Sequence, residues 1–206
     1  MTFGLKQFLH AGCGIKRRHN TTRTFASEGW HEVRLDIDPN VGPDIIGSMI
    51  KMDMIASGSM DAIYSSHSIE HHYSHEVPVA LAECLRVLTP DGFLIITCPD
   101  LQGIAALVAK GQLMQPFAES PAGPISAIDM LYGHRQSLAA GNQFMAHRTG
   151  FTRDSLAEAL KEAGFKAIAG ISRGYPFFEL WMVASKAALS DAALRELAAA
   201  HFPDTP

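Results

Sequence analysis

Phe8-Leu9-His10-Ala11-Gly12-Cys13-Gly14 is a short apolar run that ends in Gly-x-Gly. Such a run predicts a buried strand that leaves a sheet at a tight turn. Glycine permits a positive φ there and lets a ligand approach bare backbone, because no Cβ intervenes. Ligands of open α/β sheets bind at the carboxyl ends of the strands, so this turn is a candidate ligand-binding site. Gly-x-Gly alone is a weak signal, and an ordinary strand-to-loop glycine pair remains the alternative at this point.

The composition is typical of one soluble globular domain. The chain has 206 residues, 47% of them hydrophobic and 18% charged, which is enough for a substantial core. The formal net charge of −4 gives no general attraction to nucleic acid or to an anionic membrane. No apolar run approaches the length of a membrane span.

The cysteines and the N-terminus predict a cytoplasmic protein. The three cysteines are an odd number without metal-site spacing, as expected of free thiols in a reducing compartment. Residues 1–6 lead directly into the first predicted strand and contain no apolar signal-peptide segment.

A second strand is predicted over residues 32–38, where polar and apolar side chains alternate and Pro39 ends the run. Its acidic tip includes Asp36. A dinucleotide-binding fold places its ribose-binding carboxylate about 20 residues after the glycine turn, which is close to this position. A carboxylate accepts two charge-assisted hydrogen bonds from a ribose diol better than any neutral side chain does.

Strands and helices alternate along the rest of the chain. Residues 15–20 predict a loop or a stunted helix. Further strands are predicted over 60–66, 93–98, 166–173 and 177–184, and helices over 76–88, 100–110, 152–163 and 191–200. This alternation predicts a doubly wound, mostly parallel α/β sheet with an antiparallel C-terminal strand pair. Residues 111–150 are rich in Pro, Gly, Gln and Ser and are expected to form a loop-rich lid or substrate-binding insertion in a single domain spanning 1–206.

Several blocks of sequence occur in a specific order and spacing. They are Leu9–Gly14, Leu35–Pro39, Gly47–Met49, Asp61–His71, Leu85–Gly92, Phe151–Thr152 and Leu160–Phe165. Together they resemble the type-11 group of class I S-adenosylmethionine-dependent methyltransferases, from Phe8 to about Lys186 and most weakly over 111–150. The resemblance implies a Rossmann-like fold, the cofactor S-adenosyl-L-methionine and transferase activity on a methyl acceptor.

The resemblance also implies roles for individual residues. Gly12 and Gly14 are expected beneath the methionine part of the cofactor, Asp36 at the ribose hydroxyls, and Ser48 with Met49 at the adenine edge. The full expected cofactor-binding set is His10, Gly12, Cys13, Gly14, Asp36, Ile37, Ser48, Met49, Ser65 and Ser66.

The chain departs from the family pattern at three positions. His10 stands where an acid is usual, Lys16 replaces a third glycine, and Ser48 replaces an aspartate. A nicotinamide dinucleotide is a poorer match, because Arg17 occupies the third glycine position of the G-x-G-x-x-G fingerprint that pyrophosphate requires. S-adenosylmethionine has no phosphate and tolerates the more crowded turn.

A histidine cluster, His67-Ser68-Ile69-Glu70-His71-His72, is the second candidate for chemistry. In a methyltransferase, His67, Glu70 and His71 are the candidate catalytic residues, because a neutral imidazole accepts a proton from a hydroxyl or amine. The alternative is a structural role, in which Glu70 and His71 only cap and brace the loop.

The same residues also fit H-x-x-E-H, a zinc-peptidase signature that needs both histidines on one face of a helix. The cluster follows directly on a strand and leaves little helical length, so we expect no bound metal. A zinc-dependent hydrolase using His67, Glu70 and His71 remains an alternative function, and a non-catalytic cofactor-binding accessory protein is another.

The acceptor site is expected beneath the insertion. The candidate acceptor-binding residues are Asp100, Tyr132, His134, Arg135, His147 and Arg148. Arg135 and Arg148 are suited to hold an anionic group, although solvation of a flexible lid explains each of them equally well. The arginines are scattered and the net charge is negative, which argues against a nucleic-acid groove. The expected partner is a small-molecule or carbohydrate-like acceptor.

Overall fold

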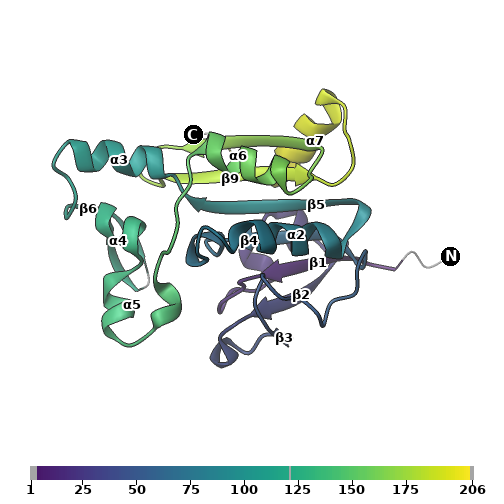
Figure 1. Ribbon diagram of the computed structural model, residues 1–206, viewed down its shortest axis with the longest axis horizontal. Coiled ribbons are helices and arrows are strands. Elements are labelled where there is room, and N and C mark those ends of the chain that lie inside the picture. The colour runs from purple at the N-terminus through teal and green to yellow at the C-terminus, as the bar shows by residue number, and fades with distance from the viewer. Residues whose placement is uncertain (1–3, 121, 205–206) are drawn as a thin grey trace.

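A seven-stranded sheet runs through the computed structural model, which describes residues 4–120 and 122–204 (Figure 1). The strand order is β3-β2-β1-β4-β5-β9-β8. The strands are β1 (Lys6–Ala11), β2 (Trp30–Asp36), β3 (Ile45–Ile46), β4 (Met60–Ser66), β5 (Leu88–Pro99), β8 (Ala167–Arg173) and β9 (Glu179–Ser185).

The sheet is mostly parallel. β1 pairs in parallel with β2 and with β4, whereas β9 runs antiparallel to both β5 and β8. The doubly wound sheet and the antiparallel C-terminal pair predicted from the sequence are therefore confirmed. The chain order reverses between β1 and β4, and a ligand crevice is expected beyond the carboxyl ends of these two strands.

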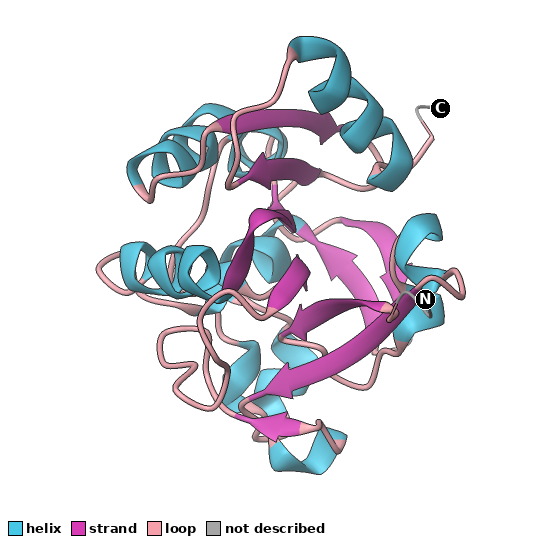
Figure 2. Cartoon of the chain, turned by 90° about the vertical axis from the view of Figure 1, so that its right-hand side faces the viewer, coloured by secondary structure: helices cyan, strands magenta, loops and turns pink. Residues whose placement is uncertain are grey.

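Helices lie on both sides of the sheet, as Figure 2 shows. α2 (Val77–Val87) and α6 (Arg153–Glu162) pack against the side that contains Leu9, and α1 (Arg23–Ala26) and α7 (Asp191–His201) cover the side that contains Phe8. Phe8 and Leu9 are both fully buried, because successive side chains of β1 point to opposite faces and each face is covered.

The helix that usually follows the first strand is reduced to the single turn α1. Residues 15–20, predicted as a loop or a stunted helix, form a loop and the 3₁₀ turn Arg18–Asn20. The ring of Phe25 in α1 stacks on Phe8 with the centroids 4.4 Å apart and contacts His201 of α7 at 4.5 Å. The C-terminal helix thus covers the part of the sheet that the short α1 leaves open.

The ends of several elements follow from local chemistry. Thr152 caps α6 by accepting the backbone N–H of Ser155, and Gly164 ends it with a φ of +109°. Strand β5 begins before the predicted range 93–98, and its pairing with β4 is irregular there, shifting from Met60 opposite Leu88 to Ala62 opposite Phe93. Strand β3 is too short to be visible in a sequence pattern.

The segment 111–150 contains more regular structure than the sequence predicted. It forms a hairpin of β6 (Pro116–Ser120) and β7 (Gly123–Ser126), followed by α4 (Ala127–Tyr132) and α5 (Arg135–Ala139). These elements pack beside α3 (Leu101–Ala109), near the carboxyl end of β5 (Figure 1). Pro121 lies outside the described residues. The role of the segment as a lid stays a prediction.

Within 4–120 and 122–204, the helices are all too short or too polar to span a bilayer.

Candidate active site

A cavity of about 1000 Å³ opens beyond the carboxyl ends of β1, β2 and β4. One side is formed by the glycine turn after β1, the acidic tip of β2, residues 47–50 and the loop after β4. The other side is formed by side chains of the segment 117–148 and by residues near the start of β9. The cavity lies at the switch point of the sheet, as expected for this topology.

The two glycines of the turn serve different purposes. Gly12 has a φ of +68°, and a Cβ at this position would collide with the side chain of Ser68. Gly14 has a φ of +52°, but a Cβ there would meet nothing within 4 Å. Gly12 is therefore required for packing, whereas Gly14 leaves bare backbone facing open space in the cavity.

Asp36 lies at the end of β2 with its carboxylate held by backbone amides. The N–H of Gly14 donates to Oδ2 at 2.7 Å, and the N–H of Asp38 donates to Oδ1 at 2.9 Å. Each oxygen keeps a free lone pair, so the carboxylate can still accept two hydroxyl groups. Asp36 lines the cavity beside the glycine turn.

Arg34 holds this corner of the cavity together, a role that no sequence pattern indicated. Its side chain is 5% exposed. The guanidinium donates to the carbonyl oxygens of Gly14 at 2.6 Å, Lys16 at 3.2 Å and Gly42 at 2.5 Å. These bonds tie the glycine turn to the loop after β2, because one planar guanidinium carries five donors.

The histidine cluster forms one 3₁₀ turn, Ile69–His71, and no longer helix. The H-x-x-E-H residues consequently do not lie on one helical face, which removes the geometry that a zinc peptidase needs. His67 has a φ of +52°, and its ring lies between Glu70, at 3.4 Å, and Glu179 of β9, at 3.3 Å. Glu179 comes from a distant strand and was not predicted.

The environment of His67 favours its protonated form. Burial lowers the pKa of His67, but the carboxylates of Glu179 and Glu70 on either side of the ring outweigh burial and raise the pKa to about 9. An imidazole that is protonated at neutral pH cannot accept a proton from an acceptor. His67 is therefore better suited to hold Glu70 and Glu179 in place than to act as a general base.

Glu70 is the most enclosed acid of the site. Its side chain is 1% exposed, and neither carboxylate oxygen receives a hydrogen bond from the described residues. His71 lies next to it, and His147 reaches it from the loop after α5, with the rings of the two histidines 4.8 Å apart. All three residues line the cavity.

The sequence of residues 9–96 matches the family described as a methyltransferase domain. This range contains the glycine turn, Asp36 and the Glu70 turn. Over this range, the chain is similar to methyltransferase domains. No curated protein sequence matches the chain significantly.

Solved structures share the fold at low sequence identity. A 1,6-didemethyltoxoflavin-N1-methyltransferase from Burkholderia thailandensis, solved with 1,6-didemethyltoxoflavin and S-adenosylhomocysteine, is 16% identical with a TM-score of 0.54; the match covers 88% of this chain and 71% of that one. The PH0226 protein from Pyrococcus horikoshii is 14% identical with a TM-score of 0.60, and 89% and 83% are covered. A SAM-dependent methyltransferase from Archaeoglobus fulgidus is 12% identical with a TM-score of 0.57, and 88% and 86% are covered.

The fold brings most of the expected cofactor-binding residues to the cavity. Those that line it are Gly12, Cys13, Gly14, Asp36, Ile37, Ser48, Met49 and Ser66. His10 and Ser65 do not line it. The His10 ring is buried and pairs through Nδ1 with Oε1 of Glu32 at 2.6 Å, and the Ser65 hydroxyl contacts the sulfur of Met49 at 3.6 Å. The sheet decides on which face of a strand each side chain lies. The spacing of residues in the sequence did not show that His10 and Ser65 face away from the cavity.

The expected acceptor-binding residues divide in the same way. His134, His147 and Arg148 line the main cavity. Tyr132 lines a smaller adjoining cavity of about 190 Å³. The smaller cavity also shares Glu70, His147 and Arg148 with the main one.

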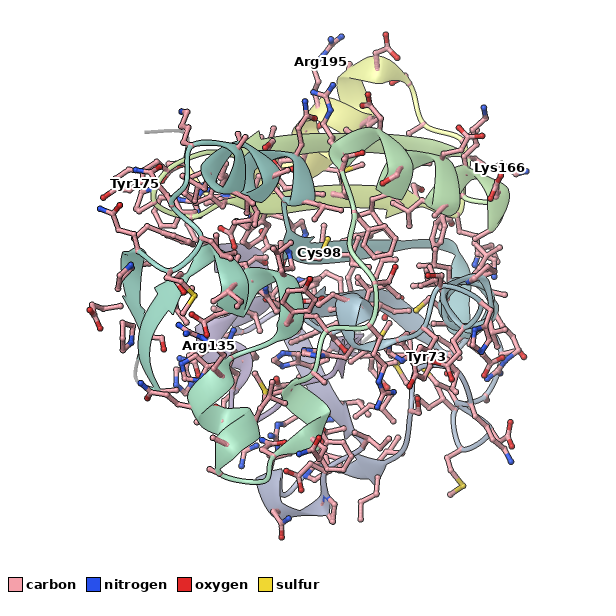
Figure 3. All side chains as sticks on the ribbon, turned by 60° about the vertical axis from the view of Figure 1, so that its left-hand side comes forward. Tyr73, Cys98, Arg135, Lys166, Tyr175 and Arg195 are labelled. Atoms are coloured by element: carbon pink, nitrogen blue, oxygen red, sulfur yellow. The ribbon has the colours of Figure 1, made fainter. Side chains whose placement is uncertain are left out.

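Two of the expected acceptor-binding residues have structural partners instead. Arg135 donates through Nε to Asp129 at 2.8 Å, next to α4 (Figure 3). Asp100 caps α3 by accepting the N–H of Gln102 at 3.1 Å, and it also accepts the hydroxyl of Ser172. Neither Arg135 nor Asp100 lines the main or the smaller cavity. The polar atoms of both residues form hydrogen bonds within the fold instead.

Proposed function

We propose that this methyltransferase transfers a methyl group to a small, partly apolar acceptor with an acidic group, which binds in the main cavity beside Glu70. The carrying observation is the Asp36 carboxylate, which two backbone amides fix beside the open Gly14 turn at the rim of a large cavity. The same cavity thus offers space and a hydrogen-bond-accepting carboxylate for the cofactor, and it also has room for an acceptor.

The described residues fit S-adenosyl-L-methionine. Bare backbone at Gly14 leaves room for the methionine part, and Asp36 has two lone pairs available for the ribose hydroxyls. Ile37, Ser48 and Met49 border the same region and are the proposed neighbours of the adenine. When bound, this cofactor supplies a methyl group activated by a positively charged sulfur.

The chain's own contribution is mainly positioning. Methyl transfer is an in-line displacement, so holding the acceptor at the right distance and angle supplies much of the rate. His71 is the remaining candidate general base, because its Nε2 is free while its Nδ1 donates to the carbonyl of Ala146 at 3.0 Å. An acceptor that is already anionic needs no base.

The lining of the cavity favours an acceptor with an apolar, flat body over a carbohydrate. Aromatic and apolar side chains line the side of the cavity opposite the cofactor region. They are Phe117, Ile125, Met130, Phe144 and Met145 of the segment 117–148, and Phe177 of the loop before β9. Arg148 borders the same space, and its guanidinium stacks on the Tyr73 ring at 4.7 Å with no carboxylate partner in the described part of the chain. An acidic group on the acceptor would pair with it.

Two measurements test the proposal. Calorimetry with S-adenosylhomocysteine should show binding, and a screen of small aromatic acids and sugars with S-adenosyl-L-methionine should release S-adenosylhomocysteine only with members of the first class. Binding without turnover of any acceptor would favour the cofactor-binding accessory protein. Turnover confined to sugars would overturn the proposed acceptor class, and absence of binding would overturn the proposed cofactor site.

A further inference from the structure

The Glu70 carboxylate lacks the partners that a buried charge requires. Both oxygens are enclosed, and neither receives a hydrogen bond from residues 4–120 or 122–204. The His67 ring approaches Oε1 at 3.4 Å, but the contact does not have hydrogen-bond geometry. The protonated His67 ring therefore offsets the charge of Glu70 without donating a hydrogen bond to it, and both carboxylate oxygens keep lone pairs for a donor or a cation from outside the chain.

The two neighbouring histidines are arranged to supply lone pairs. Nδ1 of His71 lies 3.0 Å from the carbonyl oxygen of Ala146, and Nδ1 of His147 lies 2.8 Å from the carbonyl oxygen of Met130. A carbonyl oxygen only accepts, so each Nδ1 must carry the proton. Each Nε2 is then an unprotonated lone-pair donor, which is the arrangement that orients histidines in metal sites.

We propose that Glu70, His71 and His147 bind one divalent transition-metal ion. One ligand atom from each residue lies within 4.8 Å of the other two. Ligand atoms around a tetrahedral metal with bonds of about 2.1 Å are roughly 3.3 Å apart, so small side-chain rotations close the site. The backbone already holds the two segments together, because the N–H of Arg148 donates to the carbonyl of Glu70 at 2.8 Å.

The ligand set indicates the type of ion. Two imidazoles and one carboxylate suit Zn²⁺, Fe²⁺ or Co²⁺, whereas Mg²⁺ and Ca²⁺ prefer oxygen ligands alone. Three protein ligands leave at least one coordination position open, and the cluster borders both cavities. That position would take an anionic oxygen of the acceptor. Such an acceptor needs no general base, so His71 serves as a ligand and not as a base when the ion is bound. This use of the metal rests on the proposed function, whereas metal binding itself does not.

This site replaces the sequence-based expectation that no metal binds. That expectation considered His67, which lies three residues before Glu70 and pairs with carboxylates. The structure supplies His147 instead, from a loop far along the chain, and the ligands do not need a helix.

The test is Co²⁺ titration of protein purified without a histidine tag, monitored by visible d–d absorption and by elemental analysis after removal of free metal. We expect one equivalent of Co²⁺ with bands typical of four or five ligands. His147→Ala and His71→Ala should each weaken binding at least tenfold. His72→Ala is the matched control and should bind as the wild type does, because the Nδ1 of His72 contacts the carbonyl of Ser68 and the residue is outside the cluster.

Absence of stoichiometric Co²⁺ binding by the wild-type protein would overturn the proposal, as would undiminished binding by His147→Ala. Circular dichroism checks that each variant is folded, and His147→Gln is the second variant if His147→Ala is not. S-adenosylhomocysteine binding is measured in parallel with a chelator present. Retained cofactor binding without metal binding would overturn the metal site and leave the proposed function intact.

Discussion

Oδ2 of Asp36 accepts the backbone N–H of Gly14 at 2.7 Å, which joins the ends of β1 and β2 at the rim of the main cavity. The turn that provides bare backbone and the carboxylate proposed for the ribose are thus one structural unit. Arg34 holds the same turn from beneath through its carbonyl oxygens.

The first prediction concerns the carboxylate. Asp36→Asn should weaken S-adenosylhomocysteine binding by about ten- to a hundredfold, because charge-assisted hydrogen bonds contribute about 1.5–3 kcal/mol. Calorimetry measures the change. Asp38→Ala is the control on the same acidic tip and should alter the affinity less than about threefold, since the Asp38 carboxylate accepts from Asn40. Equal losses in the two variants would argue against a specific role for Asp36.

The two glycines should respond differently to alanine. Gly12→Ala adds a collision with Ser68 to the strain of a positive φ, whereas Gly14→Ala adds only the strain, about 1–2 kcal/mol. Thermal unfolding should therefore show a clearly larger loss of melting temperature for Gly12→Ala. A folded Gly14→Ala protein should still bind S-adenosylhomocysteine more weakly, because its methyl group projects into the cavity. A Gly12→Ala protein as stable as Gly14→Ala would contradict the packing argument.

Arg34 should contribute strongly to the free energy of unfolding. Arg34→Met removes the donor of three partly buried hydrogen bonds to backbone carbonyl groups, and a hydrogen bond to a charged group contributes about 1.5–3 kcal/mol. Urea unfolding should show a loss of at least about 2 kcal/mol. Arg153→Ala is the control, because Arg153 is exposed and pairs only with Asp154 at 3.4 Å; it should cost less than about 1 kcal/mol. A loss no larger than that of the control would show that water replaces the Arg34 bonds.

Stability should fall in mild acid because of His201. Burial lowers the pKa of His201 from its ordinary value of 6.5 to about 4. Between these pH values the unfolded chain binds the proton and the folded chain does not, so the free energy of unfolding decreases as the pH falls from 6.5 towards 4. A shift of this size corresponds to roughly 3 kcal/mol.

Urea unfolding at several pH values tests this contribution. His201→Phe keeps an aromatic ring near Phe25 and Phe93, which the histidine ring contacts at 4.5 and 5.1 Å, but it cannot bind a proton. The variant should lose less stability than the wild type between pH 6.5 and 4. Identical pH profiles would assign the acid sensitivity to other groups.

What the sequence determined by itself was local. The apolar run before Gly12 predicted β1, the acidic tip at Asp36 predicted the neighbouring strand end, and Thr152 predicted the start of α6. Each rests on a short-range cause: the twofold repeat of a strand, the conformational freedom of glycine, or a side chain that caps the nearest amides. The order of these elements was enough to predict the sheet and its helices.

What only the tertiary structure decided is which distant residues meet. Glu179 reaches His67 because β9 inserts between β5 and β8, and His147 reaches Glu70 because the segment after α5 folds back over the Ile69–His71 turn. His10 and Ser65 turn away from the cavity, and Arg34 supports it from inside the fold. No periodicity records such pairings, since they depend on strand order and on the path of a long connection. The sequence could therefore name the histidine cluster, but only the fold shows that His147 joins Glu70 and His71, while His67 lies between Glu70 and Glu179.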